Sequence, residues 1–200
     1  MIGLKIDVRG LDEVKRTLAG LQRDMRDKVL QPALNKVAEK ARTEINRGIT
    51  AEYAVKAAEV RNAIDLRRAR SGDLQAVITV FGSSSKRGRS MNLIRFLGAV
   101  RGVAARGTRA KKADLAALDR ELGFLIRRAG GMKKIKGAFI GNKGRTIFRR
   151  VGKERLPIEP LQVIGFAQMF RSKKIERRVI ERVEAELPIE IQRVIKKILG

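Results

Sequence analysis

Two long segments, one near each end of the chain, repeat apolar residues every three to four positions, and they constrain the fold more than any other feature. This spacing is typical of an amphipathic helix. The first segment covers residues 11–48, with Pro32 marking a kink or a restart and Gly48 ending it. The second covers residues 166–199, where Pro188 keeps the phase and predicts a kink. The apolar positions are Val14, Leu18, Leu21, Met25, Val29, Leu34, Val37, Ala41 and Ile45, then Phe170, Val179, Val183, Leu187, Ile191, Val194 and Ile198.

A core built from these two stripes has to be aliphatic, because aromatic residues make up 4% of the chain, with one Tyr and no Trp. A chain so poor in aromatic rings needs both stripes to form a stable interior. We therefore prefer packing of the two helices within one domain to docking of part of the C-terminal stripe on a neighbouring protein.

The other patterns are shorter. Leu4, Ile6 and Val8 alternate with charged residues, as in a half-buried strand, and residues 67–81 predict two strands around a turn at 71–73. Further helices are expected at residues 51–64 and 114–128. The sequence thus predicts an α+β fold, in which a small antiparallel sheet with β-hairpins packs against long N-terminal and C-terminal helices. Residues 1–200 are expected to form a single domain, with residues 86–136 as a basic loop and helical insertion within it.

The most specific local pattern is GAFIGNKGRTIFRRVGKERLPI, at residues 137–158. Two β-type runs at 138–140 and 146–148 flank residues 141–144, which supply the positive-φ positions of a hairpin loop. Residues 152–154 predict a second turn. Pro157 is expected to end the ladder, because proline has no N–H to donate. The pattern predicts a β-hairpin with cationic tips and flanks.

This block resembles the minor tail protein Z family of lambda-like bacteriophages and prophages, and the related neck and tail-completion proteins. In those families a GAFI strand precedes an R-V-x-K-x-R-x-P-I segment and a long C-terminal helix. The resemblance implies an α+β fold and a non-enzymatic subunit of cyclic, most often six-fold, oligomers around the DNA channel. The helix expected at 114–128 departs from the compact family pattern. The matching residues are Gly137, Ala138, Phe139, Ile140, Arg150, Val151, Gly152, Lys153, Arg155, Leu156, Pro157 and Ile158.

The formal net charge of +25 is concentrated in the middle of the chain. Residues 86–155 hold 21 Lys and Arg against 4 acids, whereas the other residues hold 25 bases and 17 acids. The positive charges of this segment repel one another unless an anionic partner or a neighbouring subunit neutralises them. The chain has no Cys, no signal-peptide pattern and no apolar run near the ~20 residues of a membrane helix, so we expect a soluble protein made in a cytoplasm.

Catalysis has little support in the residue types. The absence of His and Cys removes the usual general base, most nucleophilic triads and zinc sites, so neither a metal nor a cofactor is expected. A metal-dependent nuclease built on Glu13 and Lys15, with Asp7 nearby, is the enzymatic alternative, although acids and lysines are ordinary at a helix start. Residues 141–146 contain residue types that are common in phosphate-binding loops, but they lack the spacing of such a loop and open no helix. A hairpin turn is therefore the favoured interpretation.

The basic middle has two main interpretations. Its cations contact DNA phosphates without reading sequence, or they meet acidic surfaces of other subunits. Both can hold in a ring, and a solvated charged face is the plain alternative. Phe96 and Phe124 are expected in the core and not as stacking platforms for bases. The candidate contact residues are Arg101, Arg106, Arg109, Lys111, Lys112, Lys133, Lys134 and Lys136.

The function hypothesis rests on the resemblance: a structural component of a phage tail or neck, acting in tail completion or head–tail joining as a ring-forming subunit. Its expected partners are other tail and neck proteins, further copies of itself and DNA in the channel, but no membrane. It is expected in the virion and, during assembly, in the host cytoplasm. Residues 137–151 and 101–112 are expected to face neighbours or the lumen. The alternative is a free nucleic-acid-binding protein that contacts phosphates through the basic middle.

Overall fold

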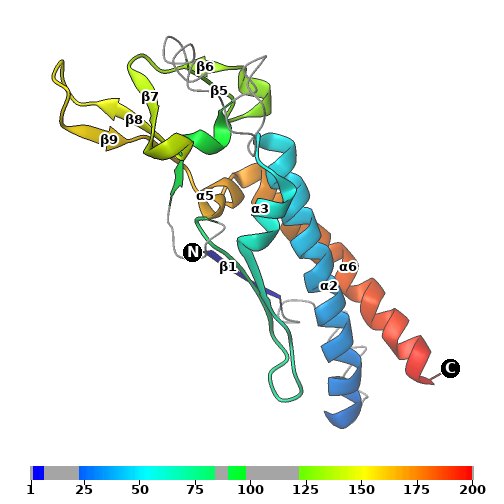
Figure 1. Cartoon of the computed structure of the whole chain (residues 1–200). Helices are drawn as coiled ribbons and strands as arrows, with labels where there is room; N and C mark the ends of the chain where they lie inside the picture. Colours follow the sequence, from blue (N-terminus) through cyan, green and yellow to red (C-terminus); the bar gives the residue numbers. More distant parts are fainter. Residues whose placement is uncertain (1, 7–22, 84–89, 98–121, 200) are drawn as a thin grey trace.

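Two long helices form the spine of the molecule in the computed structural model, which describes residues 2–6, 23–83, 90–97 and 122–199. Helices α2 (Arg23–Glu52) and α6 (Lys173–Leu199) lie side by side and run in opposite directions (Figure 1). The predicted stripe of α2 is buried from Val29 to Ile45, and on α6 the predicted Val179, Leu187 and Ile191 are buried. The two-helix core is therefore confirmed, while the stripe at residues 11–22 lies outside the described residues.

The end predicted for the first helix at Gly48 is wrong, because α2 continues to Glu52. Gly48 lies inside the helix where it approaches the start of α6. A Cβ atom added to Gly48 would lie 2.9 Å from Cγ2 of Ile175. The glycine thus allows close packing of two helices and does not terminate one. Pro32 also lies within α2.

The single helix predicted for residues 51–64 is also wrong. After α2 come a short helix α3 (Ala57–Asn62) and strand β2 (Ile64–Arg67), while Tyr53 forms an isolated bridge with Arg127. Tyr53, Val60 and Ile64 are all buried, but Val60 lies in α3, Ile64 in β2 and Tyr53 outside any helix or strand. Long-range pairing outweighs local periodicity here.

A three-stranded antiparallel sheet has the order β1-β3-β2. β3 (Ala76–Val80) is central, β1 (Ile2–Ile6) pairs with it from Ile2↔Val80 to Ile6↔Ala76, and β2 pairs with it on the other edge. Alternate residues of β3 are buried, as expected for a sheet with one face on the core. The alternating strand at the N-terminus and the strand pair around residues 71–73 are confirmed, although β2 begins earlier than predicted.

The C-terminal helical segment consists of two helices, α5 (Phe166–Phe170) and α6, and not of one. They are separated at Arg171 and Ser172. The Ser172 carbonyl accepts the first hydrogen bonds of α6 from the backbone N–H groups of Ile175 and Glu176, at 2.9 and 3.0 Å. No Gly or Pro marks this break, so the sequence pattern concealed it. Pro188 remains inside α6, as predicted.

The middle of the chain is made of short pieces. These are β4 (Met91–Asn92), η1 (Leu93–Phe96), β5 (Gly123–Phe124), η2 (Arg128–Gly130), β6 (Lys133–Lys134) and β10 (Gln162–Val163), with β4 paired to β10 and β5 to β6.

The helix predicted over residues 114–128 is wrong in its described part, residues 122–128. Phe124 forms a bridge with Leu97, and the Leu125 N–H donates to the Phe96 carbonyl at 2.9 Å. Phe96 and Phe124 are buried core residues, as predicted. The α+β class is confirmed, and among the described helices none combines the length and the apolar character that a membrane span requires.

Candidate functional site

A β-ribbon projects from the body of the molecule, at the end opposite to the N-terminal end of α2 and the C-terminal end of α6 (Figure 1). It comprises β7 (Ala138–Gly141), β8 (Thr146–Arg150) and β9 (Ile158–Pro160), in the order β7-β8-β9. The predicted hairpin is confirmed. Its turn, η3 (Asn142–Gly144), has positive φ at all three positions: 49° at Asn142, 53° at Lys143 and 80° at Gly144.

Pro157 does not end the ladder, contrary to the prediction, because β9 begins at the next residue. The Pro157 carbonyl accepts a hydrogen bond from the Val151 N–H at 3.1 Å, and Leu161 N–H donates to the Ile147 carbonyl at 2.9 Å. This alternation directs the backbone groups of Pro157, Glu159 and Leu161 toward β8 and those of Ile158 and Pro160 outward. Both prolines occupy tolerated positions, because Pro160 has its nitrogen on the free edge and Pro157 lies just before the first residue of β9.

One polar side chain ties the ribbon to the body. Asn92 Oδ1 accepts from the backbone N–H groups of Ile94, at 3.0 Å, and Ile147, at 2.9 Å. The Asn92 amide nitrogen donates to the Ile147 carbonyl at 3.4 Å. Ile147 itself is fully buried in the core. The base of the ribbon is therefore held by both polar and apolar contacts.

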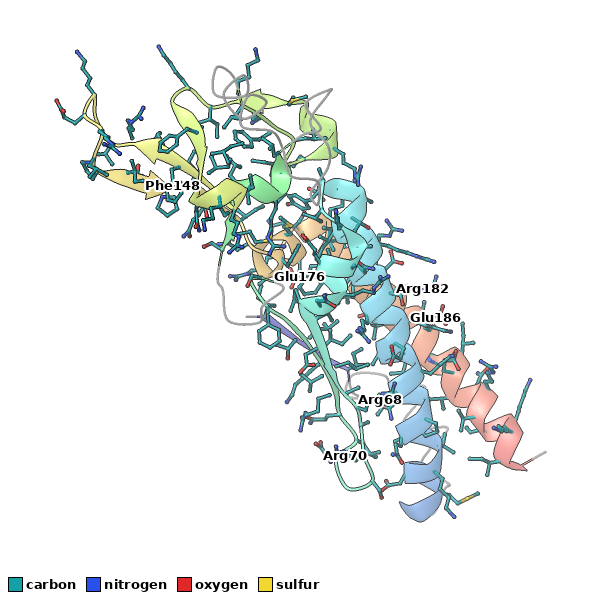
Figure 2. The ribbon with its side chains drawn as sticks, viewed as in Figure 1. Arg68, Arg70, Phe148, Glu176, Arg182 and Glu186 are labelled. Carbon is teal, nitrogen blue, oxygen red and sulfur yellow. The ribbon has the colours of Figure 1, made fainter. Side chains whose placement is uncertain are left out.

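One face of the ribbon carries an aromatic pair. Phe139 and Phe148 lie directly opposite each other on β7 and β8, with ring centroids 6.0 Å apart and an interplanar angle of 29°. The Arg150 guanidinium lies 5.1 Å from the Phe139 ring centroid, within the range of a cation–π contact. Gly141 leaves room for the Phe148 ring, because a Cβ there would lie 2.8 Å from it. Figure 2 shows Phe148 on the ribbon, at the opposite end of the molecule from Arg70.

The outer part of the ribbon, residues 149–160, is exposed at every position. Leu156 is 66% exposed and Val151 61%, the highest values among the large hydrophobic residues of the described chain. Arg149 is paired with Glu159 across the strands at 2.9 Å. The same stretch also holds Arg150, Lys153 and Arg155 against Glu154. We call residues 149–160 the ribbon tip; it combines aliphatic side chains with an excess of cations.

The predicted contact residues fall into two groups. Lys133 and Lys134 form β6 and Lys136 follows it, and all three are exposed close to the start of the ribbon. The loop predicted at residues 101–112, with Arg101, Arg106, Arg109, Lys111 and Lys112, lies outside the described residues. So do Asp7, Glu13 and Lys15, the candidate nuclease residues. Of the family-motif residues, Ala138 is buried, Phe139 and Ile140 are half-buried, and those from Arg150 to Ile158 are exposed.

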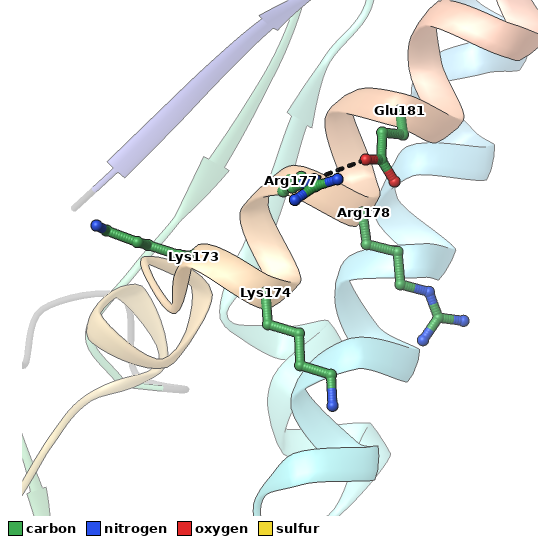
Figure 3. A pocket seen from close by; sticks show the side chains of 5 residues that line it. All are labelled: Lys173, Lys174, Arg177, Arg178 and Glu181. Carbon is green, nitrogen blue, oxygen red and sulfur yellow. Dashed lines mark hydrogen bonds and ion pairs between the residues drawn. The ribbon is translucent and has the colours of Figure 1, made fainter.

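A second cationic surface lies at the start of α6. Lys173, Lys174, Arg177, Arg178 and Glu181 line a surface hollow of about 420 Å³ (Figure 3). Arg177 is paired with Glu181 at 2.8 Å, and Arg178 with the nearly buried Glu44 of α2 at 2.7 Å. Sequence reasoning missed this surface. The two adjacent pairs of bases, four residues apart on one helix, were the available signal.

The most perturbed titratable groups stabilise the helix pair. Lys40 Nζ lies 2.6 Å from Glu186 Oε2 and 2.5 Å from Glu190 Oε1. The hydrogen bond to Glu186, followed by that to Glu190, raises the pKa of Lys40, and the hydrogen bond from Lys40 lowers the pKa of Glu186. Arg182 approaches Glu186 from the other side at 2.7 Å. Figure 2 shows Arg182 and Glu186 on α6, distant from the ribbon.

The described part of the chain contains no cluster of three or more acids that could hold a metal ion. An exposed ribbon that combines aliphatic and cationic side chains is typical of a surface that binds another molecule. The family model described as prophage minor tail protein Z (GPZ) matches residues 8–200, and the chain belongs to this family. Membership confirms the resemblance and places the chain among the structural proteins of phage tails, and so in the virion. No curated protein and no solved structure matches the chain.

Proposed function

We propose that the protein acts in tail completion or head–tail joining, as a ring-forming subunit around the DNA channel. The observation that carries this proposal is the match of a phage minor tail family over residues 8–200. The exposed ribbon supports it, because a cyclic ring needs two different complementary faces on each subunit, and a projecting element supplies one of them. A six-fold ring is the proposed stoichiometry.

In this proposal the chain is one domain with the basic segment 86–136 inserted in it. The helix pair forms the outer body, while residues 137–151 and the basic loop at 101–112 face neighbours or the lumen. Lys133, Lys134 and Lys136 are exposed beside the ribbon and suit contacts to phosphates. These cations would steady the DNA end without reading its sequence, and no catalytic step is part of the proposal.

Deletion of the gene tests the proposal. We expect particles with defective or unjoined tails, and complementation with the intact chain should restore joining. Quantitative mass spectrometry of purified particles should then find about six copies for each tail. If tails form and join normally without the protein, tail completion is the wrong role.

The second candidate is a free nucleic-acid-binding protein, which the excess of 21 bases over 4 acids in residues 86–155 favours. Such a protein binds duplex DNA alone, and its affinity falls steeply with salt. Replacing Lys133 and Lys136 with Glu should weaken binding to all sequences and reduce the salt slope by about one for each phosphate that the variant no longer neutralises. Lys28→Glu, on the exposed side of α2, is the control. Binding of duplex DNA by the isolated chain, together with normal tails after deletion, would favour this candidate.

A further inference from the structure

The ribbon tip lacks any cover from its own chain. All twelve residues from Arg149 to Pro160 are exposed: the ends of β8 and β9 are hydrogen-bonded to each other, and residues 151–157 form the bent loop that joins them. Val151, Leu156 and Ile158 are among eight exposed large hydrophobic residues of the described chain, and they lie within eight consecutive positions. A soluble protein rarely groups such side chains at the end of a projecting element unless another molecule covers them.

Resting on the proposed role in a phage tail, we propose that the ribbon tip docks into an apolar recess with an acidic rim on a different protein of the tail. The aliphatic side chains Val151, Leu156 and Ile158 would enter the recess. Lys153 and Arg155 would meet carboxylates at its rim.

The charge of the tip identifies the chemistry of this partner. Arg149 is paired with Glu159, at 2.9 Å, and Arg150 lies over the Phe139 ring. Among the other charges of the tip, the two cations Lys153 and Arg155 exceed the single acid Glu154, and the whole chain has a net charge of +25. A second copy of the chain would bring a further net charge of the same sign to the contact. An acidic partner neutralises the tip, so a different protein fits the tip better than a second copy, and contacts between copies in the proposed ring would use the rest of the ribbon.

The aliphatic side chains separate a protein partner from DNA. Phosphate contacts use cations and hydrogen-bond donors, and they leave apolar side chains in water. Burying the exposed parts of Leu156 and Val151 requires an apolar recess, which a folded protein supplies. The tip therefore has a different task from the cations at residues 133–136, which suit phosphates.

Docking through side chains is favoured over addition of a strand to the ribbon. The outward backbone positions of β9 are Ile158 and Pro160, and Pro160 has no N–H. Only the Ile158 N–H remains as an outward donor on β9. A strand added to this edge would therefore find one N–H donor where two positions should supply one each. The edge is protected against pairing, while the side chains at its end stay accessible.

Photocrosslinking inside assembled particles tests the inference. A photoreactive residue at position 156, and separately at 151, is introduced into the full chain and complements a deletion strain. Irradiated particles should yield a covalent adduct with another tail protein, joined at apolar residues that have acidic residues close to them, as identified by mass spectrometry. The matched control is position 189 on α6, where the native isoleucine is 59% exposed, and it should not give this adduct.

Charge reversal tests the acidic rim separately. Lys153→Glu with Arg155→Glu should reduce incorporation into particles at least tenfold, whereas Lys28→Glu with Lys36→Glu, at two exposed positions of α2, should leave it unchanged. Circular dichroism checks that each variant is folded. Normal incorporation of the reversed tip, or adducts at 156 only with DNA or with a second copy, overturns the inference while the tail role stands. Absence of the unmodified chain from particles instead overturns the proposed function.

Discussion

At the scale of single residues, Asn92 connects the ribbon to the body. Its Oδ1 accepts two backbone N–H groups, those of Ile94 and Ile147, which otherwise lose their partner inside the protein. We expect Asn92→Leu to cost about 1–3 kcal/mol, the penalty of leaving buried donors unpaired. Hydrogen exchange of the Ile147 amide should accelerate correspondingly.

Asn92→Asp is the matched variant for this prediction. It keeps the acceptor oxygen for both N–H groups. It loses the longer bond to the Ile147 carbonyl, at 3.4 Å, and turns a second oxygen toward that carbonyl, which costs part of the stability but leaves both N–H groups paired. Most of the protection of the Ile147 amide should therefore remain. Equal loss of protection in both variants would show that Asn92 acts by packing and not as an acceptor.

Lys40 is the second residue whose role is specific, because it joins two carboxylates of α6 to α2. Glu190 is 4% exposed, and Lys40→Met leaves it with Arg193 at 3.6 Å. Glu186 keeps Arg182. Because each acid keeps one cation, we expect a loss of about 1–2 kcal/mol in urea unfolding and not the full cost of an unpaired buried charge. Lys28→Met on the exposed side of α2 should change the unfolding free energy by less than about 0.5 kcal/mol.

The same cluster predicts a dependence on pH. Lys40 lowers the pKa of Glu186 from its ordinary value of 4.5. The resulting stabilisation is present above pH 4.5 and is lost as the pH falls through the lowered pKa of the folded state. The raised pKa of Lys40 acts at the other end: its contribution is present below pH 10.5 and is lost as the pH rises through the raised value. In Lys40→Met, the free energy of unfolding should therefore fall less steeply with pH in both the acidic and the alkaline range. An unchanged pH dependence in the acidic range would contradict this prediction.

At the scale of elements, Gly48 sets how closely α2 approaches the start of α6. Alanine normally stabilises a helix by about 1 kcal/mol relative to glycine. Here its Cβ would lie 2.9 Å from Cγ2 of Ile175, a β-branched side chain with little freedom to move. Overpacking typically costs about 1–3 kcal/mol, so Gly48→Ala should destabilise the protein by about 1 kcal/mol.

A double-mutant cycle separates these two effects. In an Ile175→Ala background the clash is absent, and Gly48→Ala should then stabilise the helix. The sign of the change should thus reverse between the two backgrounds. The same sign in both would mean that the contact with Ile175 does not limit the helix approach.

The elements also show where sequence reasoning succeeds. The stripes of α2 and α6 and the alternation in β1 were predicted because each of these elements has a single face on the core. The helices predicted at 51–64 and 114–128 were wrong where the chain is described, since their apolar residues are buried by partners distant in sequence. The break at Ser172 has no Gly or Pro to reveal it, and the serine, a residue favoured at helix N-caps, was its only local signal.

The candidate site follows the same rule. The β7–β8 hairpin was predicted because its turn contains Asn142 and Gly144, residue types that tolerate positive φ. The third strand was missed because Pro157 was judged by its missing N–H alone, although its carbonyl still accepts from Val151 and the proline lies just before the first residue of β9. Asn92 was missed because its partner Ile147 is 55 residues away, and no local pattern links the two.

At the scale of the whole molecule, the net charge of +25 opposes folding of the isolated chain. Its 46 bases face 21 acids, so even complete pairing leaves an excess of cations. Exposed ion pairs stabilise the fold by about 0–1 kcal/mol each, and salt weakens them. Salt also weakens the repulsion among the excess cations, which destabilises the fold. Because the repulsion involves the larger number of charges, raising the KCl concentration from about 20 to about 300 mM should raise the Tm in calorimetry.

Neutralising part of the excess should weaken that dependence. Lys133, Lys136, Lys153 and Arg155 are exposed, and their replacement by Gln removes four positive charges from the region that the proposed partners would cover. The variant should have a higher Tm than the native chain at about 20 mM KCl and a similar Tm at about 300 mM, because screening replaces the neutralisation at high salt. A Tm that falls with salt in both proteins would mean that ion pairs such as those of Lys40 outweigh the repulsion. The isolated chain would then need no anionic partner to relieve its charge, and that partner would matter only for assembly.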